Sequence, residues 1–185
     1  MALVTVFGAG AAGTALAIHL ARKGEDAVLW GSEHDAAVLG DLTEKRRHPA
    51  LPERLPDELR ILGPDDLEEA GAHAEIAVLG ANSAGAGPLG RLVAPALGGA
   101  RLAVSIAKGL QPETLERVSA VYARELPSIA VVAMSGPSLA AEIAEGLLTA
   151  VAFACEDEGA CKEAAEAFRS DRFLVSTTDD VVGVE

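Results

Sequence analysis

Three glycines near the start of the chain have the spacing of a phosphate-binding turn. They stand in Gly8-Ala9-Gly10-Ala11-Ala12-Gly13, between the apolar run Leu3–Phe7 and an Ala-rich stretch that begins at Thr14. In such a turn the first glycine allows a sharp bend, the second lets the backbone approach a pyrophosphate, and the third lets helix and strand pack closely. A bound pyrophosphate then faces free N–H groups at a helix N-terminus. The spacing therefore predicts a site for NAD or NADP.

The sequence leaves the choice between NAD and NADP open. In this motif an acidic residue about 20 positions later, at the end of the second strand, binds the hydroxyls of the adenosine ribose. Here that place holds Trp30-Gly31-Ser32, and Glu33 follows later than the motif expects. The basic cluster Lys45–Arg47 could meet a 2′-phosphate if its loop folds back. Trp30 fits either packing at the edge of the sheet or a place beside the adenosine.

A lysine and a Gly-Pro turn follow two further apolar runs. Lys108-Gly109 comes after Leu102–Ile106, and Ser135-Gly136-Pro137-Ser138 comes after Ala130–Met134. Open α/β sheets bind their ligands at the carboxyl ends of strands, where a cation can neutralise a phosphate. Both features also have structural explanations, because lysines are usually solvated and Ser138 has the place of a helix N-cap. Three turns at one edge of the sheet nevertheless converge on one crevice.

Composition and charge disfavour several classes of function. The 185 residues carry a formal net charge of −13, which disfavours nucleic acid and anionic membrane surfaces as partners. No apolar run reaches the length of a membrane span and Met1 leads almost directly into the first strand, so we expect a soluble, untargeted protein without stable membrane insertion. Cys155 and Cys161 suggest neither disulfides nor a metal site, as in a reducing cytoplasm. The histidines lack the spacing of a hydrolase triad, and the role of His48 stays undecided.

Short apolar runs alternate with Ala-rich stretches of helical period along the whole chain. This alternation predicts a Rossmann-like, doubly wound α/β fold, with a mostly parallel sheet covered by helices on both faces. The expected strands are Leu3–Phe7, Asp26–Trp30, Arg60–Leu62, Ile76–Leu79, Leu102–Ile106, Ala130–Met134, Thr149–Ala154 and Phe173–Ser176. The expected helices are Ala11–Lys23, His34–Leu42, Asp65–Ala70, Gly87–Leu97, Pro112–Glu125, Leu139–Glu145 and Glu158–Ser170.

No repeat or linker divides the chain, so residues 1–185 are expected to form one dinucleotide-binding domain. The segment Thr43–Leu59, with its basic residues and prolines, is expected to be a surface loop. The apolar run Val181–Val184 at the end is interpreted as the start of an interdomain helix. We therefore expect the domain to end at an interdomain junction, and an exposed apolar end to favour self-association.

Five motifs, in order, resemble the NAD(P)-dependent glycerol-3-phosphate dehydrogenases, which reduce dihydroxyacetone phosphate. The motifs are Gly8-Ala9-Gly10-Ala11-Ala12-Gly13-Thr14-Ala15-Leu16-Ala17, Leu29-Trp30-Gly31, Ala107-Lys108-Gly109-Leu110, Ser135-Gly136-Pro137-Ser138 with Glu142, and Ser176-Thr177-Thr178-Asp179-Asp180-Val181 with Gly183-Val184-Glu185.

The resemblance implies an oxidoreductase of carbohydrate and glycerophospholipid metabolism that interconverts dihydroxyacetone phosphate and glycerol 3-phosphate by hydride transfer. It implies a cytoplasmic enzyme, homodimeric at full length, that uses NAD or NADP. Together with the turn and the second strand, it implies cofactor contacts from Gly8, Gly10, Ala11, Ala12, Gly13, Trp30, Ser32, Lys108 and Ala140. It implies substrate contacts from Lys108, Gly136 and Ser138.

The chain departs from this family's pattern in two places. Ala81-Asn82-Ser83 stands where the family commonly has Val-Pro-Ser, and with Arg47-His48-Pro49 it resembles an archaeal branch. The family's general acid/base lysine lies beyond the position of Glu185, ahead of an all-helical domain, and no residue here matches it. We therefore expect dinucleotide binding with little or no turnover. The alternatives are the N-terminal domain of an opine or 2-hydroxy-acid type dehydrogenase and a stand-alone nucleotide-binding module completed by a partner chain.

Overall fold

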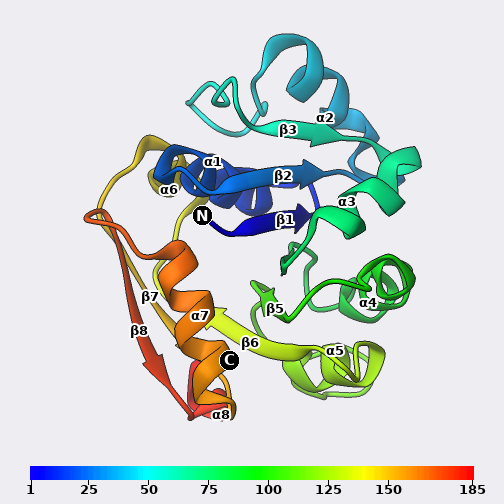
Figure 1. Ribbon diagram of the computed structural model, residues 1–185, viewed down its shortest axis with the longest axis vertical. Helices are drawn as coiled ribbons and strands as arrows, with labels where there is room; N and C mark the ends of the chain where they lie inside the picture. The colour runs from blue at the N-terminus through cyan, green and yellow to red at the C-terminus, as the bar shows by residue number, and fades with distance from the viewer.

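A computed structural model describes residues 1–185 as a single eight-stranded sheet with helices on both faces (Figure 1). The strand order is β3-β2-β1-β4-β5-β6-β7-β8. The strands are β1 (Leu3–Phe7), β2 (Asp26–Trp30), β3 (Arg60–Leu62), β4 (Ile76–Leu79), β5 (Leu102–Ser105), β6 (Ala130–Ser135), β7 (Thr149–Ala154) and β8 (Phe173–Thr178). The Rossmann-like fold class is thus confirmed, with strand bounds that differ from the expected ones by two residues at most.

The first six strands run parallel, so the turns that follow them lie at one edge of the sheet. β7 pairs antiparallel with β6, and β8 runs parallel to β7. Strand order reverses at β1, which pairs with β2 on one side and β4 on the other. In an open α/β sheet such a reversal opens a crevice beyond the carboxyl ends of the two neighbouring strands, and ligands bind there.

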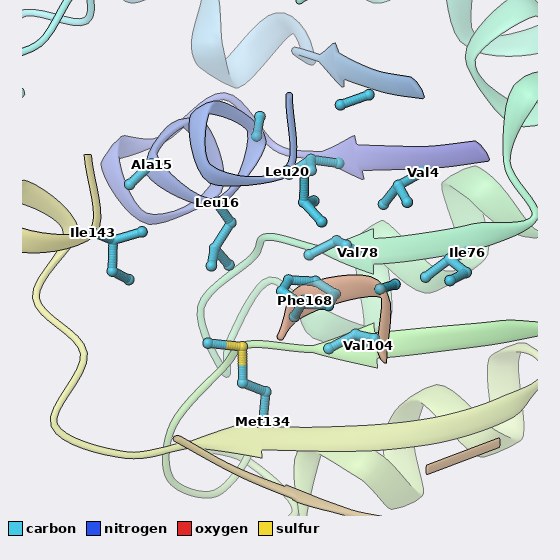
Figure 2. Packing of buried hydrophobic residues seen from close by; sticks show 14 of the residues in the cluster. Val4, Ala15, Leu16, Leu20, Ile76, Val78, Val104, Met134, Ile143 and Phe168 are labelled. Atoms are coloured by element: carbon cyan, nitrogen blue, oxygen red, sulfur yellow. The ribbon is translucent and has the colours of Figure 1, made fainter. Parts of the chain in front are cut away.

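Side chains of the central strands β1, β4 and β5 alternate between two apolar cores, as a strand buried on both faces requires. Val4, Val6, Ile76 and Val78 belong to the larger core, whereas Phe7, Ala77 and Leu79 belong to the smaller one. In Figure 2 the strand side chains of the larger core face Leu16 and Leu20 of α1 (Ala11–Lys23), with Ile143 and Phe168 completing the layer. The strands that carry the turns are therefore held rigidly from both sides.

The helices divide between the two faces in the same way. α1, α6 (Ala140–Glu145) and α7 (Glu158–Phe168) lie over the larger core, on the left in Figure 1. α3 (Leu67–His73), α4 (Ala86–Val93) and α5 (Val118–Glu125) lie over the smaller core, on the right. Short elements complete the chain: α2 (Ala36–Gly40), α8 (Val181–Val184), the 3-10 turns η1 (Glu33–Asp35), η3 (Pro64–Asp66) and η4 (Ala94–Ala96), and the π-helical turn η2 (Asp41–Lys45). No helix is long and apolar enough to cross a bilayer.

The expectation of a surface loop over Thr43–Leu59 is wrong in part. The helical path through α2 continues into η2 as far as Lys45, and Arg46 then ends it in the left-handed conformation, with φ 53°. Beyond it Leu51, Leu55 and Leu59 are buried in the larger core, and so is Leu42 ahead of it. Leucines spaced four apart anchor this segment although it forms no long helix or strand.

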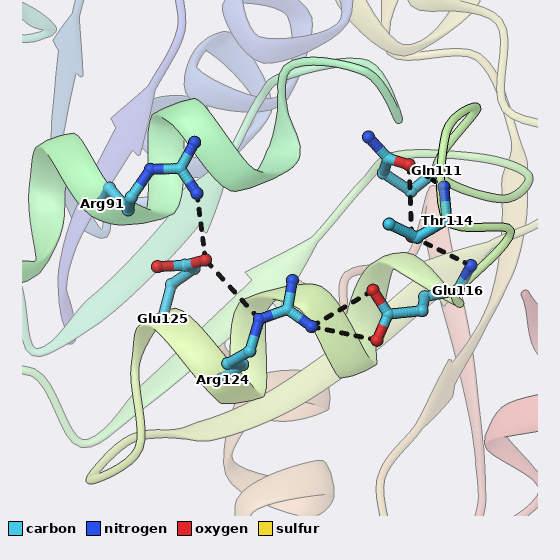
Figure 3. Close-up of polar contacts among 6 residues, drawn as sticks. All are labelled: Arg91, Gln111, Thr114, Glu116, Arg124 and Glu125. Atoms are coloured by element: carbon cyan, nitrogen blue, oxygen red, sulfur yellow. Dashed lines mark hydrogen bonds and ion pairs between the residues drawn. The ribbon is translucent and has the colours of Figure 1, made fainter.

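The helix expected over Pro112–Glu125 is also wrong in its first half, because α5 begins only at Val118. Gln111 Oε1 accepts hydrogen bonds from the backbone N–H groups of Glu113 and Thr114, both at 2.7 Å, and Leu115 has φ 58°. Leu110 and Arg117 pair as an isolated antiparallel bridge at the base of the loop. Figure 3 shows Glu116, ahead of α5, paired with Arg124 in the last turn of that helix, so side-chain contacts replace the first helical turns.

Candidate dinucleotide-binding site

The three glycines of the turn have different structural roles. Gly8 has φ 121°, and a Cβ there would lie 2.9 Å from the carbonyl oxygen of Gly80, in the turn that follows β4. A Cβ on Gly13 would lie 2.2 Å from the Gly8 carbonyl oxygen, so α1 can approach β1 only if this residue is glycine. A Cβ on Gly10 would have no atom within 4 Å. Gly8 and Gly13 are therefore required by the fold, whereas Gly10 leaves a space that the fold itself does not use.

The N-terminus of α1 faces this space without a protein partner. Gly10 is the N-cap residue with no side-chain cap, and the first turn contains no acidic residue. The first hydrogen bond of the helix runs from Thr14 N–H to Gly10 O at 2.9 Å, which leaves the preceding N–H groups available, as at any uncapped helix start. Thr14 Oγ1 also donates to Ala9 O at 3.1 Å and ties the turn to the helix. These free amides and the helix dipole favour an anion.

A cavity of about 400 Å³ opens beside the turn, at the reversal of strand order. Its walls come from the segments that follow β1, β2 and β4 and from α4. The lining residues are Gly8, Trp30, Ser32, His34, Asp35, Gly80, Ala81, Asn82, Gly85, Pro88, Leu89 and Leu92. The Asn82 region, where the sequence departs from the family pattern, thus forms one wall of this cavity. Asn82 Oδ1 accepts from Gly85 N–H at 2.9 Å, which shapes the start of α4.

Trp30 combines the two positions that the sequence left open. Its side chain is 1% exposed and packs on Phe7 with ring centroids 5.8 Å apart, and it also lines the cavity. The indole Nε1 is buried and has no hydrogen-bond partner. Trp30 is therefore a fixed floor of the cavity, with little freedom to move.

An acidic residue that the sequence analysis missed lies in η1, the turn that follows β2. Asp35 folds back so that its Oδ2 accepts from the backbone N–H of Ser32 at 2.8 Å and from Ser32 Oγ at 2.9 Å. Ser32 Oγ in turn accepts from His34 N–H at 3.2 Å, which completes a capping box around η1. The Ser-x-x-Asp pattern of a capping box was the signal that could have revealed this carboxylate.

The basic cluster of the 45–48 segment does not line the cavity. Lys45 pairs with Asp41 at 2.7 Å, and the guanidinium of Arg46 donates to the carbonyl oxygens of Leu59, at 2.8 Å, and of Pro56. His48 is 6% exposed, and its Nδ1 accepts from Ala50 N–H at 3.1 Å. Burial is the main cause that lowers the pKa of His48 from its ordinary value.

Lys108 and the Gly136-Pro137 turn meet, as the sequence predicts. Lys108 Nζ donates to the Gly136 carbonyl oxygen at 2.9 Å, and Ser138 Oγ donates to the same oxygen at 3.3 Å. Gly136 has φ 147°, and a Cβ there would lie 2.9 Å from Ala150 O in β7. A small cavity at this place is lined by Lys108 and Ser138 together with Ala12 of the phosphate turn. The two halves of the expected site are thus neighbours.

Ser138 differs from the N-cap role that the sequence suggested. Ser138 does not cap α6: the N-cap residue is Leu139, which has no side-chain cap, and the Ser138 hydroxyl serves the turn instead. Ala140 begins α6, and this helix packs along α1 as Figure 1 shows.

The two cysteines belong to another part of the fold: Cys155 directly follows β7, and Cys161 lies in α7. Both are free, and burial raises the pKa of both thiols.

Comparisons with known proteins agree on one family. Residues 3–161 match the family model described as NAD-dependent glycerol-3-phosphate dehydrogenase N-terminus. The chain is 35% identical over 185 residues to glycerol-3-phosphate dehydrogenase [NAD(P)+] of Clostridium acetobutylicum, covering 98% of the chain and 54% of that protein. It is 31% identical over 192 residues to the NADP(+)-dependent glycerol-3-phosphate dehydrogenase of Archaeoglobus fulgidus, covering 99% and 55%.

A solved structure supports the same relationship. The fold superimposes on glycerol-3-phosphate dehydrogenase from Coxiella burnetii with a TM-score of 0.88 and 30% sequence identity, covering 98% of this chain and 55% of that one. The chain thus spans about half the length of the relatives that it matches.

Proposed function

Because the chain belongs to the NAD(P)-dependent glycerol-3-phosphate dehydrogenase family, as its N-terminal dinucleotide-binding part, we propose that the Gly8–Gly13 turn seats the cofactor's pyrophosphate. The activity it serves is the interconversion of dihydroxyacetone phosphate and glycerol 3-phosphate in glycerophospholipid synthesis. On this proposal residues 1–185 are one dinucleotide-binding domain. The single sheet without an internal linker supports that assignment.

The space at Gly10 is the observation that carries the proposal. A Cβ at this residue would meet nothing within 4 Å, although Gly8 and Gly13 on either side are tightly packed. The fold gives no reason for glycine here, whereas a phosphate that approaches the backbone does. The uncapped start of α1 supplies the amides for it. The residues present therefore fit a dinucleotide.

Further cofactor contacts in the proposal follow the walls of the site. The amides of Ala11 and Ala12 lie in the first turn of α1, and Trp30 and Ser32 line the adenosine-side cavity. Lys108 lines a small cavity with Ala12, which the proposal assigns to the nicotinamide side, and Ala140 begins α6, the helix that packs along α1. When bound, the nicotinamide supplies or accepts the hydride. The protein's part in that step is to position the reactants and to stabilise charge.

Substrate contacts are assigned to Lys108, Gly136 and Ser138. The Lys108 ammonium forms one hydrogen bond, to Gly136 O at 2.9 Å, and no ion pair. An ammonium has three N–H donors, so two remain for an anionic substrate. The Gly136 carbonyl holds the lysine in place, and Gly136 itself is packed closely against Ala150 and Val151 of β7. This arrangement is suited to an anionic substrate such as a phosphate ester.

The remaining features of the proposal concern the whole protein. We propose a cytoplasmic enzyme that acts on small molecules and assembles as a homodimer, with no role in binding nucleic acid. The net charge of −13 supports the last point, because it repels a phosphate backbone.

Calorimetric titration of the purified chain with NADH and NADPH tests the proposal. We expect saturable binding of at least one of them, and dihydroxyacetone phosphate is expected to bind to the binary complex. Lys108→Met should weaken this second binding by about tenfold or more, which corresponds to ~1.4 kcal/mol. Lys162→Met is the matched control, because Lys162 pairs with Glu158 on the surface of α7. No heat with either coenzyme, or equal effects of the two lysine variants, would count against the proposal.

A further inference from the structure

The position directly after β2 carries no ribose-binding acid in this chain. That position is Gly31, and a Cβ there would lie 2.6 Å from Leu39 Cδ2 and 3.1 Å from Ala9 Cβ. Leu39 belongs to α2, and Ala9 belongs to the phosphate turn, so the crowding comes from elements on both sides. A larger residue at the place that usually holds the acid in dinucleotide-binding sheets would therefore require Leu39 to move.

Asp35 brings a carboxylate to the same wall by another route. The turn η1 carries it back toward β2, where the Ser32 N–H and Oγ both hold its Oδ2, at 2.8 and 2.9 Å. Asp35 lines the cavity together with Gly8 and Trp30. The second oxygen, Oδ1, takes part in no hydrogen bond within the protein. A fixed carboxylate with a free acceptor oxygen is what a ribose hydroxyl requires as a partner.

The lining of this cavity offers little to a 2′-phosphate. Among its twelve residues there is no lysine or arginine, Asp35 is the single carboxylate, and His34 is the one side chain that can become positively charged. Of the nearest cations in sequence, Lys45 and Arg46 are held by Asp41 and by backbone carbonyls, and Arg47, which is exposed and in no ion pair, lies outside the lining. A doubly charged phosphate would thus meet a like charge without a permanent counter-charge.

We propose that Asp35 selects NAD(H) over NADP(H), with its free oxygen accepting a hydrogen bond from the adenosine ribose while Ser32 holds the other oxygen. This step rests on the proposed dinucleotide site. It assigns the coenzyme choice to a residue of the turn after β2 and gives the Ser32–Asp35 capping box a second role. The capping box holds in place the carboxylate that binds the ribose hydroxyl.

The test compares the dissociation constants of NADH and NADPH for three forms of the chain. In the unaltered chain NADH is expected to bind about tenfold more tightly, or better. Asp35→Asn removes the charge but keeps an oxygen that can accept from Ser32, so it should bring the two constants within about threefold of each other. Glu33→Gln is the matched control: it removes a charge from the exposed neighbouring position, outside the cavity lining, and should leave the ratio unchanged.

The outcomes separate this inference from the proposed function. If neither coenzyme binds the unaltered chain, the proposed site itself is wrong. If NADPH binds as tightly as NADH, or if Glu33→Gln shifts the ratio as much as Asp35→Asn does, the assignment to Asp35 is overturned while the site stands. A ratio near one in the unaltered chain overturns the assignment even if Asp35→Asn does not fold.

Discussion

Alanine at Gly10 and alanine at Gly13 should have opposite effects, although both replace a glycine of one motif. Gly10 has φ −66° and ψ 170°, an extended conformation that alanine adopts readily, and its Cβ would enter empty space. The unfolding free energy should therefore change by less than about 1 kcal/mol. The same methyl group would stand where a phosphate must come within hydrogen-bond distance, ~2.9 Å, of the backbone. NADH affinity should fall by about tenfold or more.

Gly13→Ala should instead destabilise the fold. Its Cβ would lie 2.2 Å from the Gly8 carbonyl oxygen, about 1 Å inside ordinary van der Waals contact. The oxygen cannot move away freely, because Gly8 is itself packed on Gly80. Overpacking of this kind costs about 1–3 kcal/mol, which at an m-value of about 2 kcal/mol/M lowers the urea midpoint by about 0.5–1.5 M.

Urea unfolding and coenzyme titration on both variants check this division of roles. Gly24→Ala is a useful third variant: φ is 94° at the end of α1, so it tests backbone strain alone, far from the turn. The reasoning is refuted if Gly10→Ala binds NADH as the unaltered chain does, or if Gly13→Ala unfolds at the same urea concentration as Gly10→Ala.

Three further perturbations test the fold around the site. Tyr122→Phe removes a buried hydroxyl without a partner and should stabilise the chain by about 1 kcal/mol, seen as a rise in Tm of about 2–4 °C; a fall in Tm would mean that the hydroxyl is satisfied. Burial lowers the pKa of His19 and of His48 in the folded chain below 6.5. Below pH 6.5 the unfolded chain therefore binds more protons than the folded chain, and the unfolding free energy is lost progressively as the pH falls through the folded pKa values. The unfolding free energy should drop between pH 7.5 and pH 5.5, and the drop should be smaller when both are replaced by glutamine; an equal drop would contradict this cause. Glu185→Ala should lower the unfolding free energy, measured in urea, by about 1–2 kcal/mol. The Glu185 carboxylate is 5% exposed and accepts hydrogen bonds from Ser119 at the start of α5, from N–H at 2.8 Å and from Oγ at 2.5 Å. Glu145 is exposed, so Glu145→Ala should cost little.

The sequence predicted the strands and the phosphate turn well because both depend on local patterns. A strand such as β4 is four apolar residues buried on both faces, and the composition alone indicates this. The glycine spacing is similarly local, since Gly8 packs against the neighbouring turn at Gly80 and Gly13 packs against Gly8 and Val6. The meeting of Lys108 with Gly136 follows from parallel strands, which bring successive turns to one edge.

Other features were missed because they depend on contacts between segments or on a side chain that folds back. The loop before α5 has helix-forming residues, yet the Gln111 side chain captures two backbone N–H groups and Leu110 pairs with Arg117. The place of Asp35 in the cavity wall was missed, since the capping box that turns its carboxylate toward Ser32 shows only in three dimensions. Spacing rules fail where a neighbouring element decides which residue fits.

An acidic chain can hold an anionic dinucleotide because a cluster of its carboxylates lies at the opposite edge of the sheet from the phosphate turn. Glu25, Glu75, Glu163 and Glu166 surround a shallow cavity at the amino edge of the sheet, with Arg101 among them. The turn at Gly8 lies at the carboxyl edge, beyond the five residues of β1, which span about 16 Å. The Debye length at physiological salt is about 8 Å, so these carboxylates are largely screened from the turn. The potential that a pyrophosphate meets is therefore set by groups at the carboxyl edge, chiefly the uncapped start of α1, Lys108 and the Asp35 carboxylate, and the net charge of −13 acts against nucleic acids without acting equally against the cofactor.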